Sequence, residues 1–154
     1  MNIVKHSDGL VIGSYKHVIV DVLRGSPGVE ALEHVIERTR QVAKAYPNGQ
    51  AILNILESSA FLPTPQERKT LGAKIKELES TTKATNMLII EAKGFGAVAF
   101  RAVIAGLSFL AGNAQKVYAS VDDAVAAVAK DLPVAEKANF VKELGELVQA
   151  VRKA

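Results

Sequence analysis

The chain has 154 residues, a formal net charge of +3 and a hydrophobic fraction of 49%, which suit one globular domain. It contains no cysteine, and this excludes disulfides, thiolate metal sites and cysteine nucleophiles. Basic and acidic residues are interleaved along the sequence, so we expect no nucleic-acid-binding surface. The first six residues are too short and too polar for a secretory leader, and we expect a cytoplasmic protein.

Two β-branched runs near the start predict an antiparallel hairpin. Residues 10–12 form its first strand, residues 17–23 its second, and the glycine-containing segment 13–16 is the expected turn. A helix is predicted next, with Ser26 as its cap and Pro27 at its first helical position.

The rest of the chain alternates strands with helices. Further strands are predicted at 51–56, 86–91 and 116–119. The predicted helices begin at Pro65, Gly94, Val121 and Pro133. Thr64 and Glu67 form a capping box around Pro65, and Ser120 caps the helix at Val121. On the last helix Val134, Ala138, Val141, Leu144, Val148 and Val151 are predicted to form one apolar stripe.

The order β-β-α-β-α-β-α-β-α, plus one C-terminal helix, predicts a single-domain α/β fold. Helices between successive strands require crossovers, so we expect a mixed, mostly parallel sheet with an N-terminal antiparallel hairpin. Residues 1–130 are the predicted domain. Residues 131–154 are an appended helix that packs on the domain or on a partner.

The sequence matches no enzymatic template, and we predict no catalytic residue, cofactor or metal site. His6, His17 and His34 fit no metal-binding spacing. A nucleophile elbow and a phosphate-binding loop are absent, and the Gly94-Phe95-Gly96 turn lacks the third glycine of a dinucleotide loop. Asp21, inside an apolar strand, is the one carboxylate whose pKa burial could perturb. A structural role is its expected function, with proton transfer as the alternative.

The helix at 95–110 is apolar almost all round, unlike an amphipathic surface helix. Its own fold, a second subunit, a partner or lipid must cover it. A transmembrane span is not expected, because the stretch is short and Arg101 would lie in hydrocarbon. We predict that Arg101 and Ser108 face outward and that this helix forms an interface. The candidate interface residues are Phe95, Phe100, Arg101, Ile104 and Ser108.

The element order resembles the STAS domain, the fold of bacterial anti-sigma-factor antagonists and of sulfate-transporter tails. It is also similar to bacterial proteins grouped with lipid-binding CRAL-TRIO-type domains. In the antagonists an apolar pair and an Asp-Ser-Ser-Gly motif follow the third strand, and the first serine is phosphorylated. Here Phe61-Leu62 fits the apolar pair and Thr64 falls at the phosphorylated position. Pro63 replaces the aspartate and Gln66-Glu67 replace the turn, so the motif is broken.

The resemblance implies a partner-binding rim at 58–68, with Thr64, Ser58, Ser59 and Glu67 as candidate switch residues. A structural cap is the expected role of Thr64. The first functional hypothesis is a non-catalytic, self-associating interaction module that binds a bacterial signalling protein. The alternative is a carrier or sensor of a small apolar ligand or lipid, since the Ala- and Gly-rich helix at 95–110 leaves room for a cavity.

Overall fold

A computed structural model describes residues 1–25, 28–60, 62–91, 94–111 and 116–154. It leaves out the side chains of residues 95, 96, 104 and 107–111. The described strands are β1 (Asn2–Ser7), β2 (Leu10–Tyr15), β3 (Val18–Leu23), β4 (Gln50–Leu56), β5 (Ala84–Ile90) and β6 (Lys116–Tyr118). The described helices are α1 (Gly28–Ala45), α2 (Pro65–Thr81), α3 (Phe95–Ala111), α4 (Val121–Asp131) and α5 (Lys137–Lys153).

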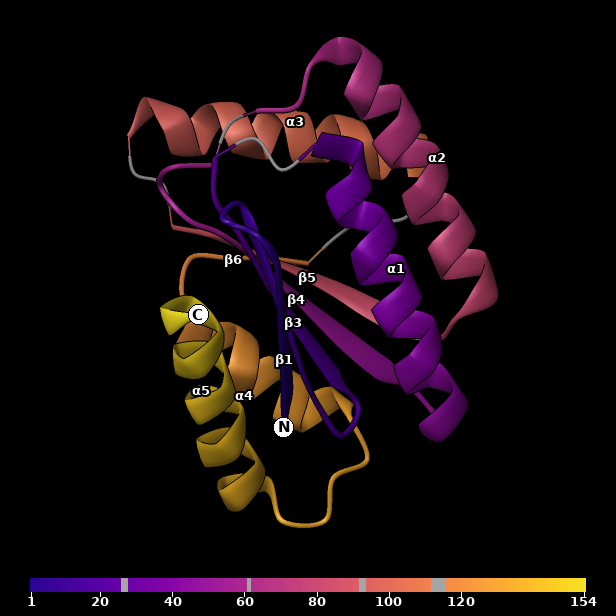
Figure 1. The fold of residues 1–154 in the computed structure, drawn as a ribbon, viewed down its shortest axis with the longest axis vertical. Coiled ribbons are helices and arrows are strands. Elements are labelled where there is room, and N and C mark those ends of the chain that lie inside the picture. Colours follow the sequence, from indigo (N-terminus) through magenta and orange to yellow (C-terminus); the bar gives the residue numbers. More distant parts are fainter. Residues whose placement is uncertain (26–27, 61, 92–93, 112–115) are drawn as a thin grey trace.

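The strands form one sheet in the order β1-β2-β3-β4-β5-β6 (Figure 1). β2 pairs antiparallel with both β1 and β3, and the pairs from β3 to β6 are parallel. The predicted α/β class with a mixed sheet is therefore confirmed. Because the parallel strands follow one another in a single direction, right-handed crossovers put α1, α2 and α3 on the same face. Helices α4 and α5 cover the other face (Figure 1).

The sheet has one strand more than the sequence predicted. β1 is an edge strand whose residues are exposed or half-buried, so it has little of the apolar alternation that marks a strand. Its register against β2 shifts between Lys5 and Ser7, and such irregularities protect a free sheet edge from pairing with other chains.

Gly13 lies within β2 rather than in the hairpin turn, which contradicts the predicted turn at 13–16. The observed turn contains Lys16, which takes a positive φ of 49°. A Cβ at Gly13 would collide with Val151 Cγ2 and lie 2.9 Å from Leu147 Cδ1. The glycine is therefore needed because α5 packs directly on the β2 backbone, and not for a turn.

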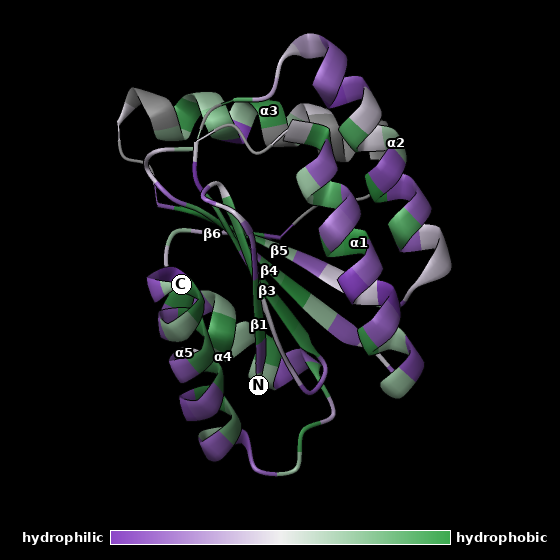
Figure 2. Ribbon diagram, viewed as in Figure 1, coloured by the Kyte–Doolittle hydropathy of each residue, from purple (hydrophilic) through white to green (hydrophobic). Residues whose placement is uncertain are grey.

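The core divides into three clusters of buried residues. The largest lies between the sheet and α4–α5, and it contains Leu53, Ile89 and Leu144 among others. A second cluster lies under α1, and a third under α3. In Figure 2 the side of α5 that faces the sheet is hydrophobic and its outer side is hydrophilic, whereas α3 is hydrophobic or neutral over most of its described surface.

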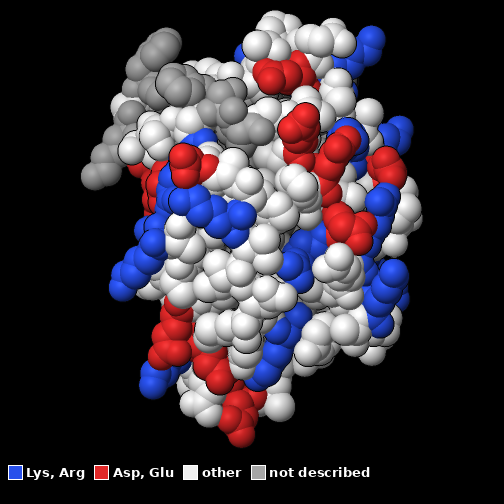
Figure 3. Space-filling model, in the orientation of Figure 1, with Lys and Arg blue, Asp and Glu red and all other residues white. Residues whose placement is uncertain are grey.

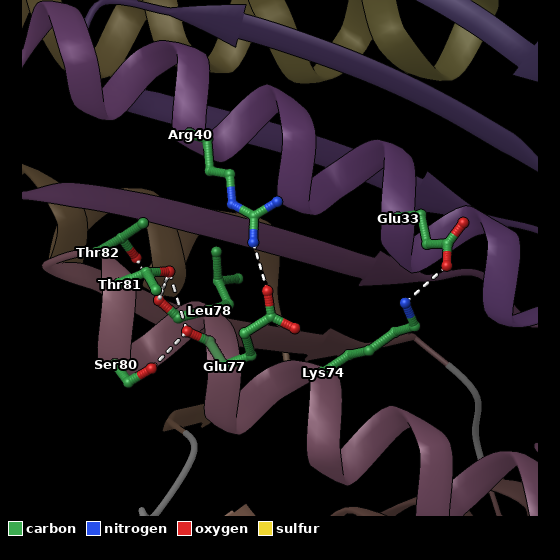
Figure 4. A network of polar contacts seen from close by, with 8 residues as sticks. All are labelled: Glu33, Arg40, Lys74, Glu77, Leu78, Ser80, Thr81 and Thr82. Atoms are coloured by element: carbon green, nitrogen blue, oxygen red, sulfur yellow. Dashed lines mark hydrogen bonds and ion pairs between the residues drawn. The ribbon is translucent and has the colours of Figure 1, made fainter.

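Helices α1 and α2 are joined by two ion pairs across their exposed sides (Figure 4). Lys74 Nζ lies 2.6 Å from Glu33 Oε1, and Arg40 Nη2 lies 2.5 Å from Glu77 Oε1. Exposed ion pairs of this kind contribute only about 0.2–1 kcal/mol each to the stability of the fold. Their main effect is to orient α1 and α2 relative to each other.

Helix α5 begins at Lys137 and not at Pro133 as predicted. Two predicted stripe residues, Ala138 and Val141, are exposed. Phe140 and Leu147 are buried instead, and together with Leu144, Val148 and Val151 they form one face at helical spacing. Burial of each such side chain contributes roughly 2 kcal/mol before the entropy of ordering is subtracted. Residues 137–153 thus pack on their own sheet.

Candidate functional site

The outer face of α3 is a stripe of small and apolar residues that contains one arginine. Val98, Arg101, Ala102, Ala105 and Gly106 are exposed, at the i, i+3, i+4, i+7, i+8 spacing of one helical face. Val98 is 61% exposed, the highest value among the exposed large hydrophobic residues described. A surface helix normally carries polar residues there, so this α3 outer face has the composition of a contact surface.

The inner side of α3 packs on the sheet. Ala97, Phe100 and Val103 are 6–8% exposed and belong to the third core cluster. The burial of Phe100 corrects its prediction as an interface residue, since it faces the sheet. Arg101 lies on the exposed side. The side chains of Phe95, Ile104 and Ser108 are outside the described part, as are Ser26, Pro27 and Phe61.

The sequence segment that contains α3 carries charge of a single sign. Residues 92–120 contain Lys93, Arg101 and Lys116 but no aspartate or glutamate. Lys116 Nζ is 2.6 Å from Asp131 Oδ2, whereas Arg101 forms no ion pair within the described residues. Elsewhere the charges alternate, as the face drawn in Figure 3 shows. Arg101 is therefore available to a partner.

Thr64 is the N-cap of α2, and its hydroxyl is already engaged. Its Oγ1 accepts a hydrogen bond from the Glu67 backbone N–H at 3.3 Å and donates one to Glu67 Oε2 at 2.8 Å. The Thr64 backbone N–H donates to the same carboxylate at 2.7 Å. The hydrogen bonds from the Thr64 backbone and side chain hold the pKa of Glu67 below its ordinary value. A phosphate on Thr64 would break this capping box and meet a like charge.

Ser58 and Ser59 are exposed in a turn that follows β4. The Ala60 N–H donates to the Glu57 carbonyl at 2.9 Å and closes the turn, and the Gly25 N–H donates to the Ser59 carbonyl at 3.0 Å. The turn is thus joined to the segment after β3. The structure places both hydroxyls on the same rim as Thr64, at the carboxyl ends of the parallel strands.

Sequence reasoning missed a network of four charged residues at this rim. Arg24 Nε donates to Glu57 Oε2 at 2.9 Å, and Arg152 Nη2 donates to Glu91 Oε1. Arg24 Nη2 also donates to the Arg152 carbonyl at 2.5 Å, which joins the two pairs. Arg24, Glu57 and Glu91 are each the first residue after a parallel strand. Their positions directly after strands could have indicated the network from the sequence, because the carboxyl ends of parallel strands meet at one edge of the sheet.

Asp21 is fully buried in the middle of the sheet. Its side chain points to the α1–α3 side, because Val20 and Val22 point to the α4–α5 core. Neither carboxylate oxygen has a hydrogen-bond partner among the described residues. Burial without a counter-charge raises the pKa of Asp21 to about 8, so this carboxyl group is mainly neutral at physiological pH.

The three histidines form two ring contacts. His6 of β1 stacks on His34 of α1 with ring centroids 4.0 Å apart, and the His17 ring lies 4.4 Å from that of Tyr46. Among the described residues no three histidine or carboxylate side chains gather where they could hold a metal ion. Gly94, before α3, takes a φ of 65°, which glycine adopts readily and other residues rarely do.

A pocket of about 210 Å³ lies at the opposite, amino-terminal edge of the strands. Polar residues including Lys83, Thr85 and Asp131 line it, together with Gln50. Gln50 is 1% exposed, and its Oε1 is buried without a partner. Because that oxygen is itself inaccessible, a ligand in the pocket could not reach it without a rearrangement.

In comparisons with known proteins, neither a protein-family model nor a curated sequence matches this chain. None of the described helices is both long enough and apolar enough to cross a membrane. The functional argument therefore rests on the residues themselves.

Proposed function

We propose that this protein is a non-catalytic protein–protein interaction module that self-associates through the α3 outer face. The observation that carries the proposal is the exposed stripe of Val98, Ala102, Ala105 and Gly106, which leaves a largely apolar helix face in water. Contiguous apolar surface of this kind is typical of association sites.

A second copy of the chain is the occupant that the stripe fits best. Alanine and glycine let two helix backbones approach closely, and an isologous contact needs only one self-complementary patch. Nothing approaches within 4 Å of the position where Gly106 would carry a Cβ, so this part of the stripe is free for a neighbour. Arg101 can lay its aliphatic stem along the interface and keep its guanidinium group at the solvated rim.

Val98→Asp tests the contact, with Val141→Asp on α5 as the matched control. Both are exposed valines on helices, 61% and 38% exposed, so neither change should disturb the core. By sedimentation equilibrium we expect dimers of the wild type and of Val141→Asp, and a dimer at least roughly tenfold weaker for Val98→Asp. Circular dichroism checks that both variants fold.

A monomeric wild type, or a Val98→Asp protein that dimerises as well as Val141→Asp, would refute self-association. A monomer that floats with vesicles of anionic lipid would instead assign the α3 outer face to a membrane surface.

The wider role proposed from the STAS resemblance is the binding of a bacterial signalling protein at the rim of Ser58, Ser59 and Thr64. The capping box supports a structural Thr64, so a regulatory modification here is better assigned to Ser58 or Ser59. Phosphate mapped to Thr64 in protein from its own host would contradict that assignment. Cytoplasmic location remains a prediction from the cysteine-free composition.

The second candidate function is carriage or sensing of a small apolar ligand. One separate observation favours it: the buried, unpartnered carboxyl group of Asp21 on the sheet face that α1, α2 and α3 cover.

A further inference from the structure

Three polar side chains lie on one face of the sheet, and two of them have atoms without partners. Asp21 lies directly opposite Asn54 of the neighbouring strand, and their Cα atoms are paired in register. Asn54 Nδ2 donates to the Met87 carbonyl at 3.2 Å. Asn86, on the next strand, has a buried Nδ2 without a partner among the described residues. Buried polar atoms are hydrogen-bonded to protein or to ordered water in nearly all native proteins, so Asp21 and Asn86 need a partner that the described residues do not supply.

The surroundings of Asp21 are apolar on two sides. Ile12 lies opposite on β2, and Ile19 precedes it on the same face of β3, both in the cluster under α1. Toward the strand ends, Leu56 and Leu88 belong to the cluster under α3. Asp21 and Asn54 thus form a polar centre between two apolar regions, which is the usual composition of a small-molecule site.

We propose that Asp21 and Asn54 are the polar centre of a buried binding site for a small uncharged molecule with a carbonyl group on a hydrocarbon body. This inference names a site and a ligand class for the second candidate function, and it does not depend on self-association.

The chemistry of the two side chains selects the ligand. A protonated carboxyl group donates one hydrogen bond, which a ligand carbonyl can accept. The raised pKa of Asp21 supports the protonated form. An ionic head group is disfavoured, because no described side chain of opposite charge faces Asp21 and an unpaired charge is costly to bury.

The carboxyl edge is the nearest route to the site, since Asp21 is two residues from the end of β3. Gly25 and Gly94 lie in loops at this edge with φ values of 59° and 65°. No atom lies within 4 Å of the position that a Cβ would take at either glycine. Because both Asp21 carboxylate oxygens are inaccessible in the described structure, a ligand reaches them only when the side chains packed between the sheet and α1–α3 rearrange.

The test uses three probes of equal chain length: 2-octanone with a carbonyl, octanoate with a charged head, and n-octane with no head group. They are added to the protein of residues 1–154 at a pH below the pKa of Asp21. Infrared difference spectra of wild type against Asp21→Asn identify the carbonyl stretch of the protonated carboxyl group. We expect 2-octanone to shift this band to lower wavenumber and to raise the thermal midpoint more than the other probes.

Asp21→Leu should bind 2-octanone roughly tenfold more weakly and lose its preference over n-octane. Thr39→Val is the matched control, because Thr39 is a second fully buried polar residue on the same side and its hydroxyl donates only to the Val35 carbonyl at 2.7 Å. The control should bind 2-octanone like the wild type.

The inference is overturned if 2-octanone leaves the band and the thermal midpoint unchanged, or if it binds wild type and Asp21→Leu equally. A band that responds only to exchange of water would show that ordered water satisfies Asp21 and would also overturn it. Each of these results is independent of dimer formation, so failure of this site and failure of the docking proposal can be told apart.

Discussion

On the α4–α5 side of the sheet the buried residues form one apolar cluster, whereas on the α1–α3 side they form two. All three fully buried polar residues of the described chain, Asp21, Thr39 and Gln50, lie on the second side or at its edge. A core that serves only to stabilise the fold has no need of buried polar side chains, because each buried polar atom lowers stability unless it is hydrogen-bonded. The contrast indicates that α4 and α5 mainly stabilise the fold, while the α1–α3 side retains groups available for function.

Replacing Asp21 removes the buried carboxyl group that distinguishes the α1–α3 side from the α4–α5 side. Among the substitutions proposed here, it should have the largest effect on the free energy of unfolding. The pKa of Asp21 is about 8 in the folded protein against an ordinary 3.8, so the folded state retains a proton that the unfolded state releases. The free energy of unfolding should therefore fall as pH rises from 3.8 to about 8, by on the order of 5 kcal/mol.

Asp21→Asn should lack this pH dependence and be the more stable protein at alkaline pH. Urea unfolding of both proteins across that pH range measures the difference. Asp8→Asn, at a fully exposed side chain, should keep the wild-type slope. Parallel pH profiles for wild type and Asp21→Asn would show that the carboxyl group is solvated and the comparison between the two sides mistaken.

An engineered cavity in the α4–α5 core tests whether α5 stabilises the fold. Leu144 is 0% exposed in the α4–α5 core, and Leu144→Ala should lower the free energy of unfolding by about 3 kcal/mol. Val141, one helical turn away in sequence but 38% exposed, provides the control, since Val141→Ala should change stability by less than about 0.5 kcal/mol. Equal losses in the two variants would mean that α5 does not pack on the sheet as described.

Much of the fold could be predicted from the sequence, and the errors in that prediction have physical causes. Hydrophobic periodicity predicts the alternation of strands and helices. The Thr64–Glu67 capping box is a local sequence pattern, and the structure contains it. β1 was missed because an exposed edge strand has little periodicity. Gly13 was misassigned because its partner, Val151, comes from the other end of the chain.

The candidate site was predicted only in part, for a related reason. The unusual composition of α3 was visible, and so was Asp21 as a carboxylate in an apolar strand. Which α3 residues face outward depends on where the helix rests on the sheet, so Phe100 was placed on the wrong side. The Arg24–Glu57 pair joins segments that are distant in sequence, and no local pattern predicts their meeting.

Loss of the N-cap of α2 should have a smaller effect on stability than the core substitution, and it concerns only the α1–α3 side. Thr64→Ala removes the hydroxyl of the capping box and should lower the free energy of unfolding by about 1 kcal/mol. The lowered pKa of Glu67 adds stability above its unfolded pKa, which is lost as pH falls through the folded pKa. Denaturant unfolding at neutral and acid pH should therefore show the variant and the wild type converging at low pH.

The smallest expected effect concerns the stacked histidines that join β1 to α1. Desolvation, His34 and Arg38 lower the pKa of His6 from its ordinary 6.5. The neutral form is thus favoured by folding, and this contribution is present above 6.5 and lost as pH falls through the folded pKa. In an NMR titration, His34→Ala should raise the pKa of His6. An unchanged titration would show that the rings do not stack in solution.

The packing of Val151 and Leu147 against Gly13 also has a consequence for how the chain is made. Tyr15 donates a hydrogen bond to Glu143 across 128 residues, so β2 is covered by a helix that is synthesised long after the strand itself. During translation the apolar sides of β2 and β3 therefore remain without α5 until residues 137–153 have left the ribosome. The emergence of residues 137–153, more than that of any single strand, should be the point at which this domain becomes resistant to proteases and to aggregation.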